Sequence, residues 1–246
     1  MTVPVAGAEA ARARMLELFP TGFEEVDSDG SVEMVAYTDA AGEEQLWHAF
    51  GGVRGEDVAA DWRERWQAFH RPVRVGPLWI GPPWEEPAAD ATAVVIDPGR
   101  AFGTGGHPTT QLCIEALLDL ERGSLLDVGC GSGVLSIAAA KLGFDPVLAL
   151  DADEHAVDAT RANALANGVV VEVRVADATT APLPESDVAL ANITRPTLAA
   201  IAPLLRSRWV IGSGYLPTDA SDLDGFRHVQ RLTRDSWAAD VYERAE

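Results

Sequence analysis

The sequence predicts an α/β protein in which a largely parallel sheet ends in an antiparallel hairpin and is preceded by a small α+β domain. Three observations support this fold class. From about residue 120, short apolar runs alternate with helix-like patterns, as in consecutive β-α-β units. A glycine-rich turn at residues 129–133 joins the first of these apolar runs to a helix pattern. After Gly214 the alternation stops, and two strand-like runs follow in close succession.

The apolar runs and helix patterns indicate where the elements of the larger domain begin and end. Strands are predicted near residues 124–128, 147–151, 170–175, 187–191 and 209–213, and helices near 133–142, 154–167 and 196–206. The second helix is expected to stop at Asn167 and Gly168, because a glycine just past a helix readily adopts the left-handed conformation. A short polar connection over 217–225 leads to the terminal hairpin, predicted near 227–232 and 237–242.

The residues before this domain divide into two further parts. Residues 1–55 are predicted to form the small α+β domain, with a helix near 6–18 and strands at GFEEVD, SVEMVAYTD and EQLWHAF. Residues 56–90 are predicted to link the domains, first as a helix carrying Trp62 and Trp66 and then as a proline-punctuated connector over Trp79–Pro87. The larger domain accordingly spans residues 91–246.

Composition excludes several functional classes. The chain has 246 residues and a formal charge of −19, which disfavours direct nucleic acid binding and favours a basic protein as partner. It has no apolar run long enough for a membrane span and no secretory signal. Its two cysteines, Cys113 and Cys130, and its five scattered histidines show no metal-ligand spacing. These features predict a cytoplasmic protein without a metal site.

The glycine-rich turn predicts a nucleoside cofactor. Glycines at 129, 131 and 133 follow Asp127, and Asp151 ends the next apolar run, where an acid can accept both hydroxyls of a ribose. A dinucleotide-binding turn would place glycine or alanine three residues after Gly131, where this chain has Val134. The pattern acid-x-Gly-x-Gly-x-Gly instead resembles the first motif of class I methyltransferases, which have a Rossmann-like sheet and use S-adenosylmethionine.

A longer set of motifs narrows the resemblance to one family. DPGRAFGTGGHPTT, DVGCGSG, LALDAD and ANITRPTL, in this order, resemble the ribosomal protein L11 methyltransferase family, which methylates lysine and N-terminal amines of this large-subunit stalk protein. The resemblance implies that S-adenosylmethionine is held at Phe102, Gly105, Thr110, Asp127, Gly129, Gly131, Gly133, Asp151, Asp177 and Asn192. The acid of the glycine motif then lies near the methionine amino group. The alternative role for Asp177 is that its carboxylate only caps a turn.

The same resemblance implies the catalytic residues. Asn192 follows a predicted strand where related amine methyltransferases hold the acceptor nitrogen, and the alternative is an ordinary turn residue. Thr104 is predicted to act with it, in a glycine-rich loop that shapes the acceptor channel together with Phe102 and His107. A general-base role for His107 is the less favoured interpretation, because a histidine at a helix start is more often structural.

Three departures from the family pattern leave the target open. Thr194-Arg195 replaces the leucine and small residues that usually follow the asparagine. The opening strand of the N-terminal domain is reduced to residues 2–5, and the connection over 217–225 is short for the family's last helix. The predicted function is methyl transfer to a protein amine of the ribosomal stalk. The alternatives are a lysine methyltransferase of a nonribosomal protein, a noncatalytic adaptor that binds the cofactor, and a nicotinamide-dependent oxidoreductase.

Overall fold

In the computed structural model, the chain forms two compact units, residues 1–64 and 65–246. The structure describes residues 2–4, 7, 8, 11, 14, 15, 18, 19, 23–28, 31–36, 38, 40–53, 70–98 and 103–245. The helix predicted over 56–69, with Trp62 and Trp66, lies outside these residues, as does Phe102. The helix predicted over 6–18 lies partly outside them, and its described residues 8, 11, 14, 15 and 18 are helical.

The first unit is a three-stranded antiparallel sheet with helical cover. Its strands are β1 (Thr2–Pro4), β2 (Glu24–Ser28) and β3 (Ser31–Val35), with β3 in the centre. Val32, Met34 and Met15 form its buried core, and Leu46 of helix α2 (Ala40–Phe50) joins them. The strand predicted at EQLWHAF is therefore wrong. Helix α2 includes the alanines before this run, and Leu46 and Phe50 lie one turn apart, so that they share one helix face.

The second unit is built on a seven-stranded mixed sheet with the order β12-β13-β11-β10-β7-β8-β9. Five neighbouring strands are parallel, and β13 and β12 join their edge in antiparallel fashion. The strands are β7 (Leu125–Val128), β8 (Val147–Asp151), β9 (Glu172–Val175), β10 (Val188–Asn192), β11 (Trp209–Tyr215), β12 (Phe226–Arg234) and β13 (Trp237–Arg244). The predicted fold class, with its parallel strands and terminal hairpin, is confirmed.

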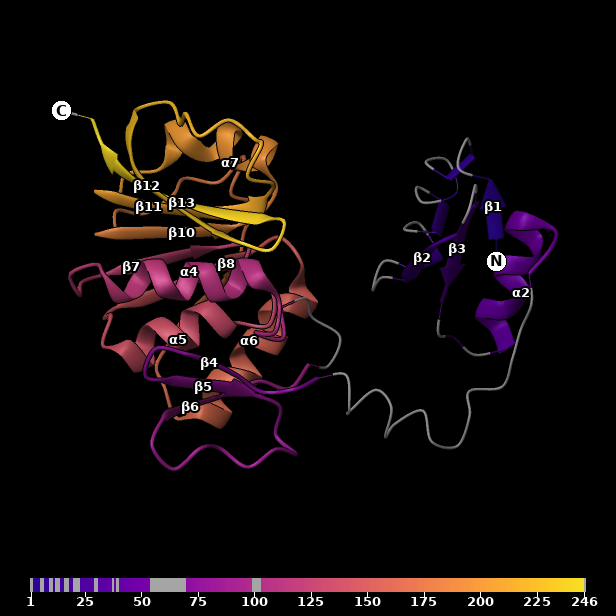
Figure 1. Cartoon of the computed structure of the whole chain (residues 1–246), viewed down its shortest axis with the longest axis horizontal. Helices are drawn as coiled ribbons and strands as arrows, with labels where there is room; N and C mark the ends of the chain where they lie inside the picture. The colour runs from indigo at the N-terminus through magenta and orange to yellow at the C-terminus, as the bar shows by residue number, and fades with distance from the viewer. Residues whose placement is uncertain are drawn as a thin grey trace. The chain divides into compact units, whose positions relative to one another are not determined.

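Helices cover both faces of this sheet (Figure 1). Helices α4 (Pro108–Leu118), α5 (Val134–Leu142) and α6 (Glu154–Asn167) pack side by side on one face. Helix α7 (Arg195–Ile201) and the short 3-10 turn Ala202–Leu204 cover the other face, where the single predicted helix over 196–206 is interrupted at Pro203. Within the part of the chain that the structure describes, no helix is both long and apolar enough to cross a membrane.

Local signals explain where the helices stop. Gly168 ends α6 in the left-handed conformation at φ 64°, and its N–H donates to the carbonyls of Ala164 and Leu165, as predicted. Gly143 ends α5 in the same way at φ 95°. Asp153 begins α6, because its carboxylate accepts the N–H of His155 at 2.9 Å.

A second small sheet, which the sequence pattern did not predict, packs on the helices of this unit. Strands β4 (Val73–Val75), β5 (Leu78–Gly81) and β6 (Thr92–Val95) have the order β4-β5-β6, and β6 contacts α5 and α6. Leu78 and Ile80 are buried in the same core as α4 and α5. The extended or looped connector predicted over Trp79–Pro87 is extended over Trp79–Gly81, but this part is a paired strand of a sheet and not a plain connector. The prediction of a loop fits the residues that follow. The prolines after Gly81 bound the strand but did not prevent it.

Candidate active site

The predicted site residues gather at the edge of the sheet where the parallel strands end. Strands β8 and β9 lie on one side of β7, and β10 lies on the other side. The strand order therefore reverses between β7 and β10. Ala191 pairs with Val128, which places Asn192 level with Gly129 across this reversal. In open α/β sheets, ligands bind in the crevice at such a point. The sequence motifs of β7 and β10 therefore meet where the fold offers a binding site.

The glycine turn has the backbone shape that the motif predicts. Gly129, Gly131 and Gly133 all have positive φ, at 77°, 56° and 82°. A Cβ at Gly129 would lie 2.7 Å from Cγ2 of Ile193, and one at Gly133 would lie 2.7 Å from Cγ2 of Thr160. Thr160 also donates its hydroxyl to the Gly131 carbonyl at 2.9 Å. Glycine is therefore required here both for backbone conformation and for space.

Asp151 is held against the glycine turn. One carboxylate oxygen accepts the N–H of Gly131 at 2.9 Å, and the other accepts the N–H of Asp153 at 3.0 Å. The carboxylate is half-buried at the tip of β8. Because an ionised carboxylate has about four acceptor positions, these two bonds orient Asp151 while leaving it capacity for a ligand hydroxyl.

Asp127 is fully buried on β7 beneath the turn. Its Oδ2 accepts the hydroxyl of Ser136 at 2.5 Å, whereas its buried Oδ1 has no hydrogen-bond partner among the described residues. Burial raises the pKa of this carboxyl to about 6, against the lowering effect of the Ser136 hydrogen bond, and Asp151 raises it further. A buried acceptor without a donor is costly, so this oxygen is suited to a cationic ligand group.

Asn192 lies at the end of β10, and the next residue locks this segment to the glycine turn. Asn192 itself is half-buried and pairs with Ser213 of β11. The N–H of Ile193 donates to the Ser213 carbonyl at 2.9 Å, and the Ile193 side chain fills the space beside Gly129. A Cβ at Gly214, where φ is 101°, would lie 2.4 Å from the Ile193 carbonyl oxygen. The asparagine segment is thus packed between two glycines.

The glycine-rich loop before α4 closes the site from another direction. The Ser132 hydroxyl donates to the Gly103 carbonyl, which ties this loop to the glycine turn. Gly105 has φ 90°, and a Cβ there would lie 2.4 Å from Cγ2 of Ile80. Thr104 is half-buried in the loop, and Thr110 is buried in the first turn of α4.

His107 begins helix α4. Its Nδ1 accepts the N–H of Thr109 at 3.3 Å, and its ring meets the Trp237 ring edge-on with 4.8 Å between centroids. Desolvation by burial lowers the pKa of His107 below its usual value. This is a helix-capping histidine, as expected for its position at a helix start.

Asp177 follows β9, and its carboxylate caps a turn. Its Oδ1 accepts the N–H and the hydroxyl of Thr179, at 2.9 Å and 2.6 Å. The side-chain hydrogen bond from Thr179 is the main reason that the pKa of Asp177 is lowered. This geometry is that of the turn-capping alternative, and a contact with an adenine edge stays a prediction.

Three residues in contact with the site were not predicted from the sequence. They are Ser136, Ile193 and Trp237, which contact Asp127, Gly129 and His107. Ser136 is the one that a pattern could have indicated, because it is a polar residue in the otherwise apolar helix run VLSIAAAKL. Within the described residues, no three His, Cys, Asp or Glu side chains gather where they could hold a metal ion.

These residues fit S-adenosylmethionine. The unpartnered Oδ1 of Asp127 suits a ligand ammonium, the missing Cβ atoms of the turn allow close approach to the backbone, and Asp151 is positioned for a ribose. The fit depends on the glycine turn and two acids, all of which come from two neighbouring β-α units. A nicotinamide dinucleotide would require a small third residue where Val134 begins α5.

Comparison with known proteins identifies the family. The family model described as "Ribosomal protein L11 methyltransferase (PrmA)" matches residues 22–244. The chain belongs to this family. The resemblance drawn from the motifs is thereby confirmed.

Individual relatives agree with this assignment. The ribosomal protein L11 methyltransferase of Vibrio campbellii is 43% identical over 179 residues, which are 66% of this chain and 59% of that protein. The protein of the same name from Aeromonas hydrophila is 40% identical over 193 residues, 71% of this chain and 66% of its own length. The chain therefore matches about two thirds or less of the length of these relatives.

A solved structure agrees as well. The crystal structure of a ribosomal protein L11 methylase from Lactobacillus delbrueckii subsp. bulgaricus superposes with a TM-score of 0.65 at 27% sequence identity. The match covers 72% of this chain and all of that one. The similarity of the two structures supports the class I methyltransferase fold.

Proposed function

We propose that this protein transfers methyl groups from S-adenosylmethionine to lysine or N-terminal amines of ribosomal protein L11, a large-subunit stalk protein. One observation carries the proposal: Asn192 stands level with Gly129 at the reversal of strand order, so that the asparagine proposed to bind the amine lies beside the turn proposed to bind the cofactor. Membership of the family supports the activity and the substrate.

The glycine turn and the two acids would hold the cofactor. The ionised Asp127 would accept a hydrogen bond from the methionine ammonium, Asp151 would accept hydrogen bonds from the ribose hydroxyls, and Gly129 and Gly131 would let the ligand lie against the backbone. Gly133, Gly105, Thr110, Asp177 and Phe102 complete the proposed set of contacts. When bound, the cofactor supplies a methyl group on a cationic sulfur, which is open to displacement by an amine.

Asn192 would position the acceptor. Its side-chain carbonyl accepts a hydrogen from the incoming nitrogen and aligns the nitrogen's lone pair with the methyl group. The amine must be neutral to react, and a free lysine has a pKa near 10.4. A desolvated crevice beside a positive charge lowers that pKa, so that positioning and desolvation replace a dedicated base. Thr104 is proposed to line the same channel from the glycine-rich loop.

The protein partner is proposed to be recognised by charge and by the first unit. The net charge of −19 attracts a basic ribosomal protein in the cytoplasm, and residues 1–55 are proposed as the substrate-recognition domain. The same field repels a nucleic acid backbone, so the target is the free or exposed protein rather than RNA.

The proposal is tested with purified L11 and labelled S-adenosylmethionine. Wild-type protein is expected to label L11, and Asn192→Ala to lose this labelling by about a hundredfold or more while retaining cofactor affinity. Thr218→Ala, a change at an exposed residue of the β11–β12 connection, serves as a control. Labelling of another protein in a cell extract, with none on L11, would support the nonribosomal alternative. Cofactor binding without any transfer would support an adaptor.

A further inference from the structure

The turn of the terminal hairpin lies at the same edge of the sheet as the candidate active site. Strand β13 runs antiparallel to β11, and Ala238 pairs with Tyr215. Strand β13 thus begins where β11 ends, which is the edge where Asn192 ends β10. The turn between Arg234 and Trp237 contains Asp235 in the left-handed conformation, at φ 53°. Two side chains of this turn contact the segment that carries the glycine-rich loop.

The first contact is a relay through helix α4. Arg234 donates from Nη1 to Oε1 of Gln111 and from Nη2 to Oε1 of Glu115, both at 2.6 Å. The other end of the same amide, Nε2 of Gln111, donates to the Gly106 carbonyl at 2.9 Å. The guanidinium therefore fixes which way the Gln111 amide faces, and the amide in turn holds the loop at Gly106.

The second contact is aromatic. Trp237 meets His107 edge-on at 4.8 Å and 67°, and His107 both follows Gly106 and begins α4. The loop is thus held from the hairpin at Gly106 and His107, and from the cofactor turn at Gly103 through Ser132. Thr104 and Gly105 lie between these two anchors. Their position depends on both.

We propose that Arg234 and Trp237 are positioning residues for methyl transfer, which hold residues 103–107 in the conformation that receives the acceptor amine. This inference rests on the proposed function. It differs from a merely structural role, in which Arg234 would attach the hairpin to α4 and the link onward to Gly106 would have no consequence.

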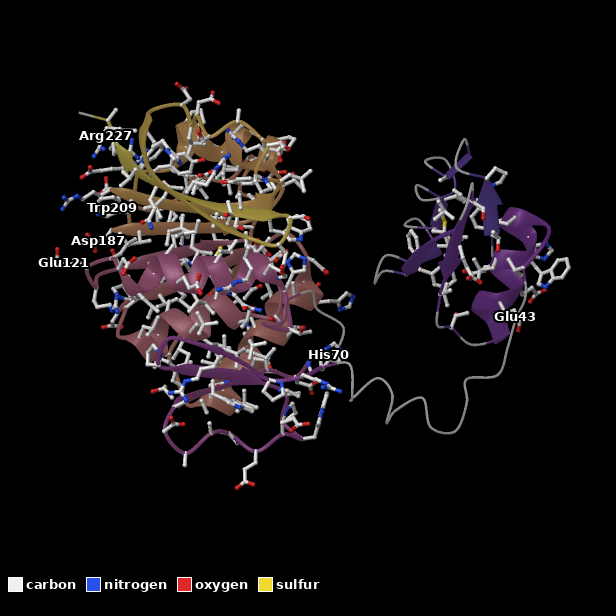
Figure 2. All side chains as sticks on the ribbon, viewed as in Figure 1. Glu43, His70, Glu121, Asp187, Trp209 and Arg227 are labelled. Carbon is white, nitrogen blue, oxygen red and sulfur yellow. The ribbon has the colours of Figure 1, made fainter. Side chains whose placement is uncertain are left out.

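Gln111→Glu separates these two roles. A glutamate at this position still accepts from Arg234, so that the hairpin stays attached, but it has no donor for the Gly106 carbonyl. Arg234→Met removes the bonds to Gln111 and Glu115, so that the Gln111 amide is free to turn away from Gly106. Arg227→Met is the matched control, because Arg227 is on the same strand, β12, as Arg234. It pairs with Glu243 at the opposite edge of the sheet, beside Trp209 and Asp187 (Figure 2).

Hydrogen exchange of the full chain gives a readout that does not depend on activity. In Gln111→Glu and Arg234→Met, the amides of Thr109 and Thr110, which donate to the side chain and the carbonyl of His107, are expected to exchange about tenfold faster than in the wild type and in Arg227→Met. Methyl transfer to L11 is expected to lose about tenfold in kcat/KM in both variants. The affinity for S-adenosylmethionine is expected to fall much less, because Gly105 is the one proposed cofactor contact among residues 103–107. Trp237→Phe, which retains a ring, is expected to restore part of what Trp237→Ala loses.

Two results would overturn the proposal. One is a Gln111→Glu variant that matches the wild type in exchange and in kcat/KM, because then only the attachment of the hairpin matters. The other is a loss of cofactor affinity as large as the loss of activity, which would indicate general loosening. If the wild type methylates no protein, the proposed function fails, whereas the exchange measurement still tests the link from the hairpin to the loop.

Discussion

The affinity for S-adenosylmethionine should depend on pH through Asp127. The free protein holds this carboxyl with a pKa of about 6, and ligand binding uses its ionised form. Below pH 6 the carboxyl must lose a proton before it can bind the ligand ammonium, so the dissociation constant should rise about tenfold per pH unit. An α-amino group loses its own proton near pH 8, so affinity should also weaken above that value. The expected optimum lies between these limits.

Ser136→Ala provides the perturbation that tests this argument. The Ser136 hydroxyl donates to Oδ2 of Asp127 at 2.5 Å, and both side chains are fully buried. The backbone N–H of Ser136 also lowers the pKa of Asp127, and the variant keeps it. A hydrogen bond to a charged group contributes about 1.5–3 kcal/mol, which corresponds to a rise of about one to two pH units in the pKa of Asp127. The acid limit of binding should therefore move from about 6 to about 7–8, and the maximal affinity should fall because the two limits then meet.

Isothermal titration of the cofactor from pH 5 to 9 would measure both profiles. Ser207→Ala is the matched control, because Ser207 is also fully buried and its hydroxyl contacts Ser186 instead of the site. Its profile should coincide with that of the wild type. A wild-type affinity that does not change between pH 5 and 8, or a Ser136→Ala profile with the wild-type acid limit, would refute the assignment of Asp127 to the ammonium.

Three further outcomes are expected. Gly214→Ala should lower the unfolding temperature by several degrees and the free energy of unfolding by about 2 kcal/mol or more, because its Cβ would meet the Ile193 carbonyl. Gly143→Ala has similar φ strain but open space around the new Cβ, and it should cost about half as much in the same thermal scan. Asp151→Ala should weaken cofactor binding by about a hundredfold in titration calorimetry, and an unchanged affinity would remove Asp151 from the site. The folded protein binds the Asp127 proton more tightly than the unfolded chain does. The contribution of this group to the free energy of unfolding should therefore fall by on the order of 3 kcal/mol as pH rises from about 4 to about 6. Denaturant titrations of the wild type and of Asp127→Leu would check this, because the fall should be missing in the variant.

The sequence predicted the elements of the larger unit well because their signals are local. Each parallel strand is an apolar run bounded by turn residues, and Gly168 stops a helix through its own backbone. The motif residues Gly129, Asp151 and Asn192 could be placed at one edge, because strands of the same direction end at the same side of a sheet. Position along the chain was sufficient to place these residues.

The remaining features depend on contacts between distant residues, for which the sequence pattern carries no signal. Strands β4 to β6 exist because α5 and α6 cover them, and the prolines around residue 82 gave the opposite indication. Helix α2 was predicted as a strand because its short apolar run fits either period. The contact of Arg234 with Gln111 joins residues 123 positions apart, and no periodicity predicts such a pair.

Two of the three places where the chain is predicted to depart from the family pattern are joined in the structure. Arg195 follows the asparagine segment, and its guanidinium donates to the carbonyls of Ala220 and Asp222 in the short β11–β12 connection. From the other side, Arg231 donates to the carbonyls of Pro217 and Asp219. A helix satisfies its carbonyls internally, whereas an irregular connection must find other donors.

The two arginines are those donors, and each is itself embedded in a polar cluster. Arg231 forms a two-pronged ion pair with the fully buried Asp240, which also accepts from Tyr215. Arg195 lies close enough to Tyr242 to affect the pKa of its phenol, which burial raises to about 12. The short connection and the Thr194-Arg195 sequence are therefore joined by hydrogen bonds in the structure. Because Arg195 is three residues from Asn192, these bonds hold the chain that follows the proposed acceptor-binding residue.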